Sequence, residues 1–588
     1  MIVPMKKATI LFETADAELT VKDLRTLGVL HIEHQNPPEG RDISALAEKV
    51  TLINSSLDVL NRAEASANNI PPQNTINGDW SAIAEHIIGL DKREEQLESS
   101  SRTITGQINE WERWGNIDPD QIFHLSQKGI FLRLYQVPVK ETGNFPDDVL
   151  VKTIFTAGDI ANCVAVSRRQ YECAFKEVLP PKQSLSSLKK LLAENSSESE
   201  KIKDEIFDAA CYSEDLVKIM KGLEKEIEFR QVISGMGMEG AIGYVTGYIP
   251  SDREEHLFAE ARSRNWGIMV DELSDDDNVP TLLRNPAWVD RIKPVFEILG
   301  LTPGYRELDI SMPFLVFFSI FFGILIGDAG YGLVYILITL VLQKRLKPDA
   351  ELRTTFSLVY LLGSCAILWG VLTGTFFGQS WLLTFGYKPL VPQLNDANDM
   401  QTFCFFLGAL HLSIAHSWRA YLKFPSLTAL ADAGWICVLW TAFFLARTLI
   451  LGEAFPTWGL WLFATGIILV ILFTSPQARV LRGIGEGIGT VALSLMNNFT
   501  DVISYVRLFA VGLASLAIAE TTNTLSSGFG DGVAAFAAGV VILIIGHGLN
   551  IILGLMSVLV HGVRLNVLEF SGHANVTWSG FSFEPLKE

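Results

Sequence analysis

The sequence is short of the features that mark most enzymes and disulfide-bonded proteins. Its 588 residues include six cysteines, and none of them stands in a CxxC or other ligand-like spacing. Three fall in apolar stretches, so we interpret all six as structural thiols in a reducing compartment. They are Cys163, Cys173, Cys211, Cys365, Cys404 and Cys437. Residues 1–310 contain no P-loop and no metal-ligand cluster, so the sequence predicts no catalytic site, metal or cofactor there.

Basic charge is also scarce. The chain has 47 Lys+Arg against 65 Asp+Glu, a formal net charge of −18, and residues 1–300 alone hold 33 of the basic and 49 of the acidic side chains. An acidic surface repels nucleic acid and anionic lipid, so we predict protein partners for this half and no nucleic acid. The first residues, MIVPMKKATILFETADAEL, show no cleavable signal, and this half is therefore expected to stay cytoplasmic.

Two kinds of pattern fill residues 1–280. Residues 8–12, 17–27 and 29–33 follow as strand, helix and strand, which predicts a small α/β lobe. Apolar residues then recur at alternating steps of three and four, the seam of a coiled coil. The seam comprises Ile43, Leu46, Val50, Ile53, Leu57 and Leu60, then Leu97, Ile104, Ile108 and Trp111, and finally Leu185, Leu188, Leu192, Ile202, Ile206, Ala209, Leu216, Met220, Leu223 and Ile227, with polar breaks at Asn195, Ser199 and Ser213.

These patterns predict a cytoplasmic arm of the α+β class, in which two small α/β lobes are bridged by an antiparallel coiled coil. A return helix of roughly 45 residues would be about 65–70 Å long, and it can pair with both earlier helical stretches. The expected division of the arm, residues 1–310, is a proximal lobe (1–40 with 236–280), a coiled coil (41–115 with 184–230) and a distal lobe (116–180). The alternative is that the heptads belong to ordinary amphipathic helices of a compact domain.

Residues 311–588 are dominated by apolar runs with few charges, which predicts an all-α polytopic membrane domain. The runs are 313–342, 355–378, 401–422, 429–450, 457–474, 487–525 and 533–568. The last two span about 35–39 residues, or roughly 50–60 Å of helix against a ~30 Å hydrocarbon core. Helices of that length must tilt steeply or protrude, and steep tilt suits helices that wrap a curved object.

The basic residues decide between seven and eight spans. If 313–342 crosses twice, every basic loop and the C-terminal tail lie inside, as the positive-inside rule requires. We therefore predict about eight helices, the first two short or partly re-entrant around Gly327, Asp328, Ala329 and Gly330. Arg447, at an outer end, is the one exception. The inside residues are Lys344, Arg345, Lys347, Arg353, Arg419, Lys423, Arg479 and Arg482.

Arg507 is the most informative charge in the membrane half. It lies near the centre of an apolar run, where a charged side chain costs about 2.5–3.5 kcal/mol on insertion scales. Neither Asp501 nor Glu520 is three or four residues away, the spacing at which helix neighbours pair. An acidic partner on another helix or another chain is therefore required, and we predict a functional role. The alternative is an ion pair to another helix of this same chain.

Further polar residues surround Arg507 in the sequence. Arg564 lies closer to an inner end, where it can reach the interface. The other polar groups are candidates for lining two water-filled half-channels on either side of Arg507, or else for hydrogen bonds between helices worth about 0.6 kcal/mol each. These candidates are Asn497, Asn498, Thr500, Asp501, Ser504, Ser515 and Glu520, with His547, Asn550 and His561 as weaker ones. His411 and His416 are expected only to pack.

Several motifs, in order along nearly the whole chain, resemble the a/I subunit family of V-type and A-type rotary ATPases. The motifs are LGVLHIE (27–33), GYIP (247–250), GYRELDISMPFLVFFSIFFGILIGDAGYGL (304–333), LGSCAILWGVLTGTFFG (362–378), SYVRLFAVGLASLAIA (504–519) and HGVRLNVLEF (561–570). The resemblance maps the family's essential arginine to Arg507 and its second arginine to Arg564. Eukaryotic members carry glutamates where this chain has Leu493 and Gly554, and a histidine where it has Ser515. The chain looks more like bacterial members.

The resemblance implies a non-catalytic stator subunit in the cell (inner) membrane. Its expected partners are rotor-ring subunits with an intramembrane carboxylate, peripheral-stalk subunits, a central-stalk or ring-cap subunit, and membrane lipid. ATP hydrolysis would occur in other subunits, and ions would pass by two half-channels and the rotating ring. Whether the ion is H⁺ or Na⁺, and whether the complex pumps or synthesises ATP, stays open.

Two other classes are weighed against this one. A secondary transporter with a regulatory domain predicts internal repeats, and 311–588 shows no convincing repeat. A scaffold whose arginines pair only within the chain predicts that nothing is conducted even beside a ring. Neither class explains the ordered motifs.

Overall fold

The computed structural model describes residues 1–588 except 66–73, 77, 171–172, 180–181, 347, 380–387, 475–490, 492–493, 529–531 and 588. Lys347, Arg479, Arg482 and Leu493, which the sequence analysis uses, lie outside the described residues. The chain divides into two compact units, one formed by 1–10, 29–33 and 247–585 and the other by 11–28, 34–246 and 586–588. Each unit is described by itself.

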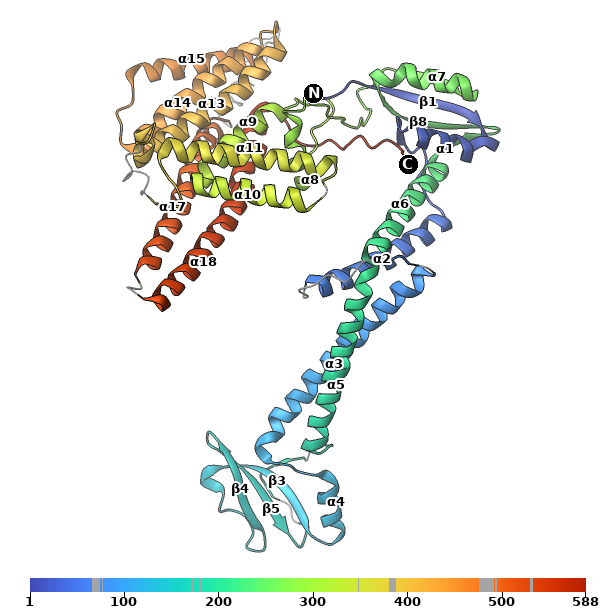
Figure 1. The fold of residues 1–588 in the computed structure, drawn as a ribbon, viewed down its shortest axis with the longest axis vertical. Helices are drawn as coiled ribbons and strands as arrows, with labels where there is room; N and C mark the ends of the chain where they lie inside the picture. Colours follow the sequence, from blue (N-terminus) through green and yellow to red (C-terminus); the bar gives the residue numbers. More distant parts are fainter. Residues whose placement is uncertain are drawn as a thin grey trace. The chain divides into compact units, whose positions relative to one another are not determined.

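A sheet is built from strands at both ends of the cytoplasmic half, in the order β2-β8-β1-β9, with β7 paired to β8 (Figure 1). The predicted strand, helix and strand at the start of the chain are confirmed. The elements are β1 (Met5–Glu13), α1 (Ala17–Leu27), β2 (His31–Glu33), β7 (Gly237–Glu239), β8 (Ile242–Pro250), α7 (Glu254–Arg264) and β9 (Gly267–Asp271).

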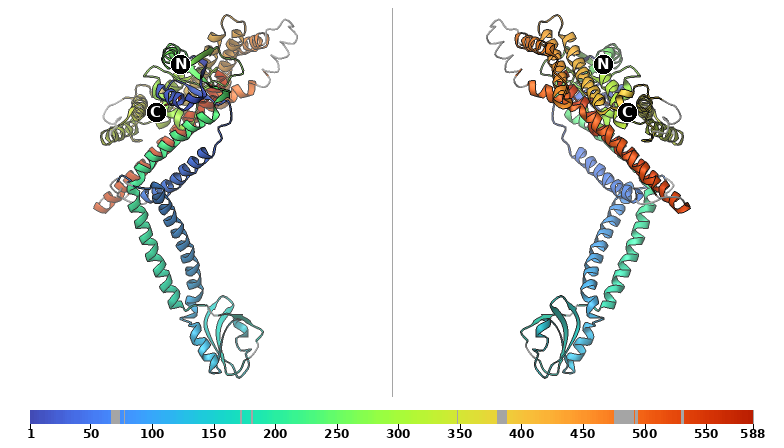
Figure 2. Two further views of the ribbon diagram at one scale, coloured as in Figure 1. Left: turned by 90° about the vertical axis from the view of Figure 1, so that its right-hand side faces the viewer. Right: turned by 90° about the vertical axis from the view of Figure 1, so that its left-hand side faces the viewer.

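The coiled coil, which we call the strut, has two antiparallel sides made of helices. One consists of α2 (Arg41–Ala65) and α3 (Trp80–Trp111), and the other of α5 (Leu185–Ala209) and α6 (Ser213–Gly235). Helix α3 pairs with α5 and α2 with α6, as both views in Figure 2 show. The predicted coiled coil is confirmed, but its return helix is not continuous. A 3₁₀ turn at Ala210–Tyr212 separates α5 from α6.

The strut's apolar seam continues into a second sheet at the far end. Its order is β4-β5-β3-β6, with α4 (Pro119–Gln127) beside it. Its strands are β3 (Phe131–Pro138), β4 (Leu150–Ala157), β5 (Ile160–Ser167) and β6 (Lys176–Val178). Trp111, Trp114 and Leu134 share one buried cluster, so the last turn of α3 packs on this sheet. Asn195, predicted as a polar break, is buried and donates to Ser100 Oγ at 3.2 Å.

The C-terminal half is helical and apolar, as predicted. Its main helices are α9 (Ser311–Ile326), α10 (Ala329–Arg345), α11 (Ala350–Thr373), α13 (Ala397–Lys423), α14 (Ala429–Leu451), α15 (Thr457–Phe473), α17 (Val506–Ser527) and α18 (Val533–Ser557), with the short helices α8 (Lys293–Leu299) and α19 (Ser571–Ala574). Among the described residues, four helices are long and apolar enough to cross a membrane, or five if the bent pair α9–α10 counts as one span.

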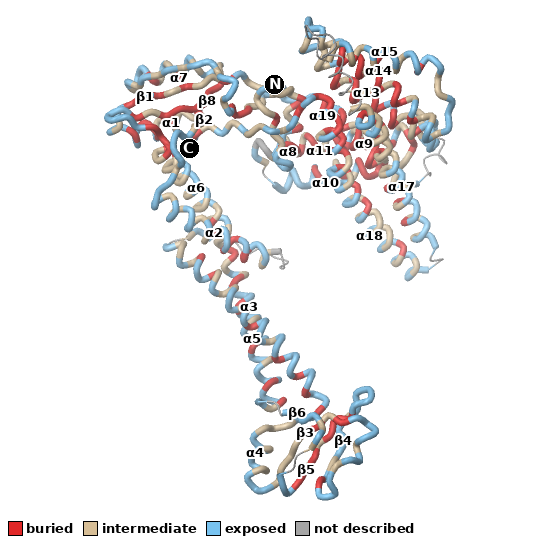
Figure 3. The backbone as a smooth tube through the Cα atoms, turned by 180° about the vertical axis from the view of Figure 1, so that it is seen from behind, coloured by how far each residue is buried: buried red, intermediate tan, exposed pale blue. Residues whose placement is uncertain are grey.

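Helix α9 is the centre of this half. Its phenylalanines are buried on every side, which marks a helix surrounded by others, and it packs against α11, α17 and α18. It meets α10 at a bend of 117°, which confirms the predicted break at Gly327 and Asp328. In Figure 3, buried residues gather on α9 and its neighbours, whereas much of α17 and α18 is exposed.

Asp328 stabilises that bend. Its side chain is 4% exposed and accepts four backbone N–H groups. Oδ1 accepts from Gly330 at 2.7 Å, Tyr331 at 3.2 Å and Phe377 at 2.8 Å, and Oδ2 accepts from Gly378 at 2.8 Å. Two of these donors belong to the first turn of α10, where a carboxylate is favoured. The same group therefore caps α10 and ties it to the segment that follows α11.

We expect Gly370→Ala to destabilise the membrane half. A methyl group on Gly370 would lie 2.7 Å from Ala329 Cβ and closer still to its backbone nitrogen, so α11 and α10 would have to separate. Overpacking of this kind costs about 1–3 kcal/mol. The measurement is the thermal midpoint of the purified protein in detergent. Gly548→Ala, on α18 with nothing within 4 Å of the new methyl group, is the control; equal midpoints for both variants would contradict the expectation.

Candidate functional site

Arg507 lies in the long helical stretch Ser494–Ser527 with its side chain 22% exposed. Its Nη2 donates to Ser504 Oγ at 2.7 Å, one turn earlier. That hydroxyl donates in turn to Glu569 Oε1 at 2.8 Å, and Arg507 Nη1 lies 3.8 Å from the same oxygen. Nη1 is buried and makes no hydrogen bond to any described residue. The guanidinium is thus anchored on one side and keeps an unused donor.

Glu569 is the acidic partner that Arg507 required, and sequence reasoning missed it. Arg564 Nε also lies 3.7 Å from Glu569 Oε1, so two arginines share one carboxylate that is 5% exposed. Arg507 therefore forms an ion pair within the chain, as the alternative interpretation predicted. The pair does not balance the charge, because two positive charges face one negative charge. Arg564 remains 53% exposed.

The local helix geometry explains why the sequence did not reveal the pair of Arg564 with Glu569. Arg564 and Glu569 are five residues apart, outside the spacing of three or four at which α-helical side chains pair. The helix widens into π-helical turns at Val558–Gly562 and Leu565–Phe570, on both sides of Arg564. A π turn bonds residue i to residue i+5, and such turns occur often at functional sites. The sequence signal that could have identified Glu569 is that it is the single acidic residue in HGVRLNVLEF.

A polar network follows Arg507 on the C-terminal side. Ser515 Oγ donates to Asn550 Oδ1 at 3.2 Å, and Asn550 Nδ2 donates to Tyr331 Oη at 2.9 Å. Tyr331 Oη also lies 2.7 Å from His547 Nδ1, and His547 Nε2 lies 3.1 Å from Asn523 Oδ1. The structure thus brings together three predicted residues, Ser515, His547 and Asn550. Tyr331 and Asn523 complete the network and were not predicted.

A cavity of about 360 Å³ lies beside the same helix. One face of α17 and the chain around Gly327 and 373–375 form its walls, and Glu520 lines it together with Gln379, Asn395 and Asp396. A cavity of this size with several polar groups can hold a number of water molecules. Glu520 itself is exposed.

On the N-terminal side of Arg507, Asp501 contacts His573. Asp501 Oδ2 lies 3.1 Å from His573 Nε2. Of the other predicted residues, Asn498 is buried, Asn497 and Thr500 are exposed, and the Thr500 hydroxyl donates back to Met496 O. His561 is half-buried one turn before Arg564. These four make none of the contacts that join Asp501, Ser504, Ser515, His547 and Asn550 to their networks.

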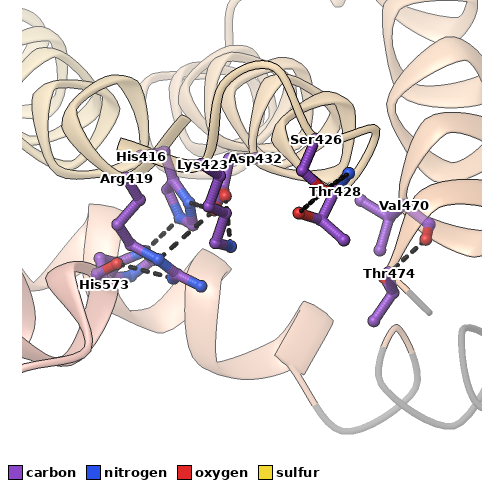
Figure 4. A network of polar contacts seen from close by, with 9 residues as sticks. All are labelled: His416, Arg419, Lys423, Ser426, Thr428, Asp432, Val470, Thr474 and His573. Carbon is purple, nitrogen blue, oxygen red and sulfur yellow. Dashed lines mark hydrogen bonds and ion pairs between the residues drawn. The ribbon is translucent and has the colours of Figure 1, made fainter. Parts of the chain in front are cut away.

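The two histidines of α13 behave differently from each other. His411 is buried and stacks on Phe317 and Phe570 at centroid distances of 3.8 and 4.3 Å, with Nδ1 2.8 Å from Tyr505 Oη. His416 does more than pack, so that prediction was wrong. It lies between Asp432 and His573 in a buried polar network (Figure 4). Among the described residues, no group of three or more His, Cys, Asp or Glu is arranged to hold a metal ion.

We expect Glu569→Ala to lower the stability of the membrane half. The change leaves Arg507 without its carboxylate and Ser504 without an acceptor, at a cost of about 1–3 kcal/mol for buried polar groups left unsatisfied. The measurement is thermal unfolding in detergent, with Glu520→Gln as the control on an exposed acid. An unchanged midpoint for Glu569→Ala would show that the pair contributes nothing.

No family model matches the chain. The chain is 29% identical over 621 residues to V-type ATP synthase subunit I of Borreliella burgdorferi and 30% identical over 636 residues to V-type ATP synthase subunit I 1 of Treponema pallidum, with 100% of each protein covered. A-type ATP synthase subunit I of Methanocaldococcus jannaschii is 23% identical over 439 residues, which cover 68% of this chain and 63% of that protein.

Among solved structures, the cytoplasmic N-terminal domain of subunit I, homolog of subunit a, of V-ATPase covers 45% of this chain and 99% of its own at 13% identity. Its TM-score of 0.24 is too low to support an argument. The family therefore rests on the sequence relatives, which match from end to end. With 30% identity over the full length of the Treponema pallidum protein, this chain belongs to the subunit I family of V-type and A-type ATP synthases.

Proposed function

We propose that this chain is the membrane stator subunit of a rotary ATPase, and that Arg507 meets a carboxylate carried by each passing rotor subunit. The observation that carries the proposal is the charge balance at Glu569. Arg507 and Arg564 share this single carboxylate, and Arg507 Nη1 has an unused donor. A surplus positive charge in an apolar environment is costly until an anion reaches it. An intramembrane carboxylate on another subunit supplies that anion.

The outer surface of α17 and α18 supports a partner on this side. In the most apolar 18 residues of Val533–Ala574, 11% are buried, and in the most apolar 18 residues of Ser494–Ser527, 28% are buried. A large uncovered apolar surface fits lipid or the apolar helices of another subunit. Arg564 is exposed on the same pair of helical stretches, and lipid tails would not satisfy it.

The polar groups on either side of Arg507 fit two half-channels. On one side are the Ser515, Asn550, Tyr331 and His547 network and the cavity beside Glu520. On the other side is the Asp501–His573 contact. A fixed cation between the two paths repels a positive ion and so blocks direct leakage. It also favours the ionised form of the rotor carboxylate and hence release of its ion. Arginine suits this role because it stays charged.

The cytoplasmic half fits the arm that resists torque. We propose that residues 1–310 form this arm and that 311–588 form the ion-translocating domain. The paired helices α2, α3, α5 and α6 form a long coiled coil that packs on the sheet of β3 to β6, and the acidic charge of this half favours protein partners. The arm would bind peripheral-stalk subunits and contact the central stalk or ring cap. In this proposal the subunit is non-catalytic, and ATP hydrolysis takes place in other subunits.

We expect Arg507→Ala and Arg507→Lys to abolish ATP-driven ion uptake in vesicles that hold the assembled complex. Alanine removes the cation, and lysine cannot supply the planar fork that binds two partners. The matched control is Arg447→Ala, because Arg447 pairs with Glu453 at another helix end. Uptake and ATPase activity are measured together, with complex assembly checked by gel filtration.

Persistence of uptake in both Arg507 variants would refute the proposed role of Arg507. It would leave the second candidate, in which Arg507 is only a structural ion pair within the chain. That candidate is favoured by one observation, the intrachain ion pair of Arg507 with Glu569.

A further inference from the structure

Four titratable side chains form an unbroken chain of contacts inside the membrane half. Asp501 Oδ2 lies 3.1 Å from His573 Nε2, and His573 Nδ1 lies 2.9 Å from His416 Nε2. His416 Nδ1 lies 3.1 Å from Asp432 Oδ1. We name this the Asp–His–His–Asp chain. Its residues come from four segments that are distant in sequence, the helical stretch Ser494–Ser527, α19, α13 and α14, and Figure 4 shows three of them together.

Three hydrogen bonds along the Asp–His–His–Asp chain require one proton more than two neutral histidines provide. Each of the three contacts is a hydrogen bond and therefore needs one proton. A neutral imidazole brings one N–H, and an ionised carboxylate brings none. Two neutral histidines supply two protons, so a third must reside on one of the four groups. Without this third proton, one of the three contacts would bring two lone pairs to hydrogen-bond distance. That arrangement is costly in a buried position.

The extra proton can move along the chain without displacement of any heavy atom. When it starts on Asp501, it passes to His573 Nε2. His573 releases its Nδ1 proton to His416 Nε2, and His416 releases its Nδ1 proton to Asp432 Oδ1. All three hydrogen bonds are kept, each donor becoming an acceptor, and the net result is one proton transferred from Asp501 to Asp432. Rotation or re-protonation of the imidazoles resets the chain.

The Asp501 end of the Asp–His–His–Asp chain is more accessible than its other three groups. The side chains of His573, His416 and Asp432 are 6%, 5% and 2% exposed, whereas Asp501 is 30% exposed. At the other end, Asp432 is held by Lys423 Nζ at 2.6 Å, a residue that is 37% exposed. Water can therefore reach the Asp501 end directly, and the Asp432 end only through Lys423.

Two cations set the charge at the Asp432 end. Arg419 Nε lies 3.5 Å from Asp432 Oδ1, and its Nη1 donates to His573 O at 2.9 Å. Lys423 contacts the other carboxylate oxygen. Both cations favour ionised Asp432. Lys423 is an ammonium with no lone pair, so a proton on Asp432 leaves only when Lys423 gives one of its own protons to water and then takes the proton from Asp432. Asp501 stands six residues before Arg507, about 9 Å along the helix, which places the other end near the proposed rotor contact.

We propose that the Asp–His–His–Asp chain is a proton relay between Asp501, near Arg507, and the exposed Lys423 end, and hence that the transported ion is H⁺. This inference rests on the proposed function, because it supplies one of the two half-channels. It makes His573 and His416 relay residues, although neither lies beside Arg507 in the sequence.

The test uses the assembled complex in vesicles, with a pH-sensitive dye to follow ATP-driven uptake in sodium-free buffer. His573→Gln and His416→Gln keep an amide that hydrogen-bonds but does not relay a proton. We expect loss of uptake per assembled complex in both variants. In His573→Ala, we expect added imidazole to restore uptake, which a purely structural role would not allow. His411→Gln, a buried histidine on α13 outside the chain, is the control and should retain uptake per assembled complex.

Wild-type uptake in either glutamine variant would overturn the relay. Uptake that needs sodium and collapses with a sodium ionophore but not with a protonophore would overturn it as well, while leaving the role of Arg507 intact. Survival of uptake in Arg507→Ala would instead defeat the proposed function. If a histidine variant does not assemble, Asp501→Asn at the exposed end replaces it. This change keeps an acceptor for His573 and removes the proton-binding group, so retained uptake would again overturn the relay.

Discussion

A charge buried in an apolar environment costs several kcal/mol unless it is paired or fully hydrogen-bonded, and the described part of the membrane half contains three buried carboxylates under this constraint. Asp328, Asp432 and Glu569 are 4%, 1% and 5% exposed. Each is compensated differently. Asp328 accepts backbone N–H groups, Asp432 binds two cations and a histidine, and Glu569 lies between two arginines. Much of the arrangement of the helices follows from where these partners must stand.

The compensation also explains the irregular backbone. The bend between α9 and α10 leaves N–H groups without helical partners, and Asp328 accepts two of them at the start of α10. The π turns around Arg564 let that residue and Glu569 share one side of the helix. In lipid, broken backbone is tolerated only where protein or water satisfies it. The breaks are therefore found beside the polar networks, and they concentrate the chemistry near Arg507.

Around Arg507, the two polar networks differ in kind. The network at Ser515, Asn550, Tyr331 and His547 is made mainly of hydroxyl and amide groups and lies near a cavity that can hold water. The Asp–His–His–Asp chain is made of titratable groups, and its interior is closed to solvent. A hydrated path and a side-chain relay are two physical solutions to moving a proton through an apolar region, and the protein contains groups suited to both.

Sequence patterns alone predicted the helical arm, the apolar helices, the break at Gly327 and Asp328, and the need of Arg507 for an acidic partner. Those inferences follow from local properties: heptad spacing, hydropathy, and the cost of a lone charge in an apolar run. Glu569 pairs with Arg564 at a spacing of five residues, which an ordinary α-helix would not pair. Which acid meets Arg507 depended on helix packing, because Glu569 lies on another helix. For the same reason His416 looked like a packing residue until Asp432 and His573, 16 and 157 positions away, were seen to contact it. Sequence periodicity reports the neighbours within one helix, and contacts between helices are set by how the helices pack.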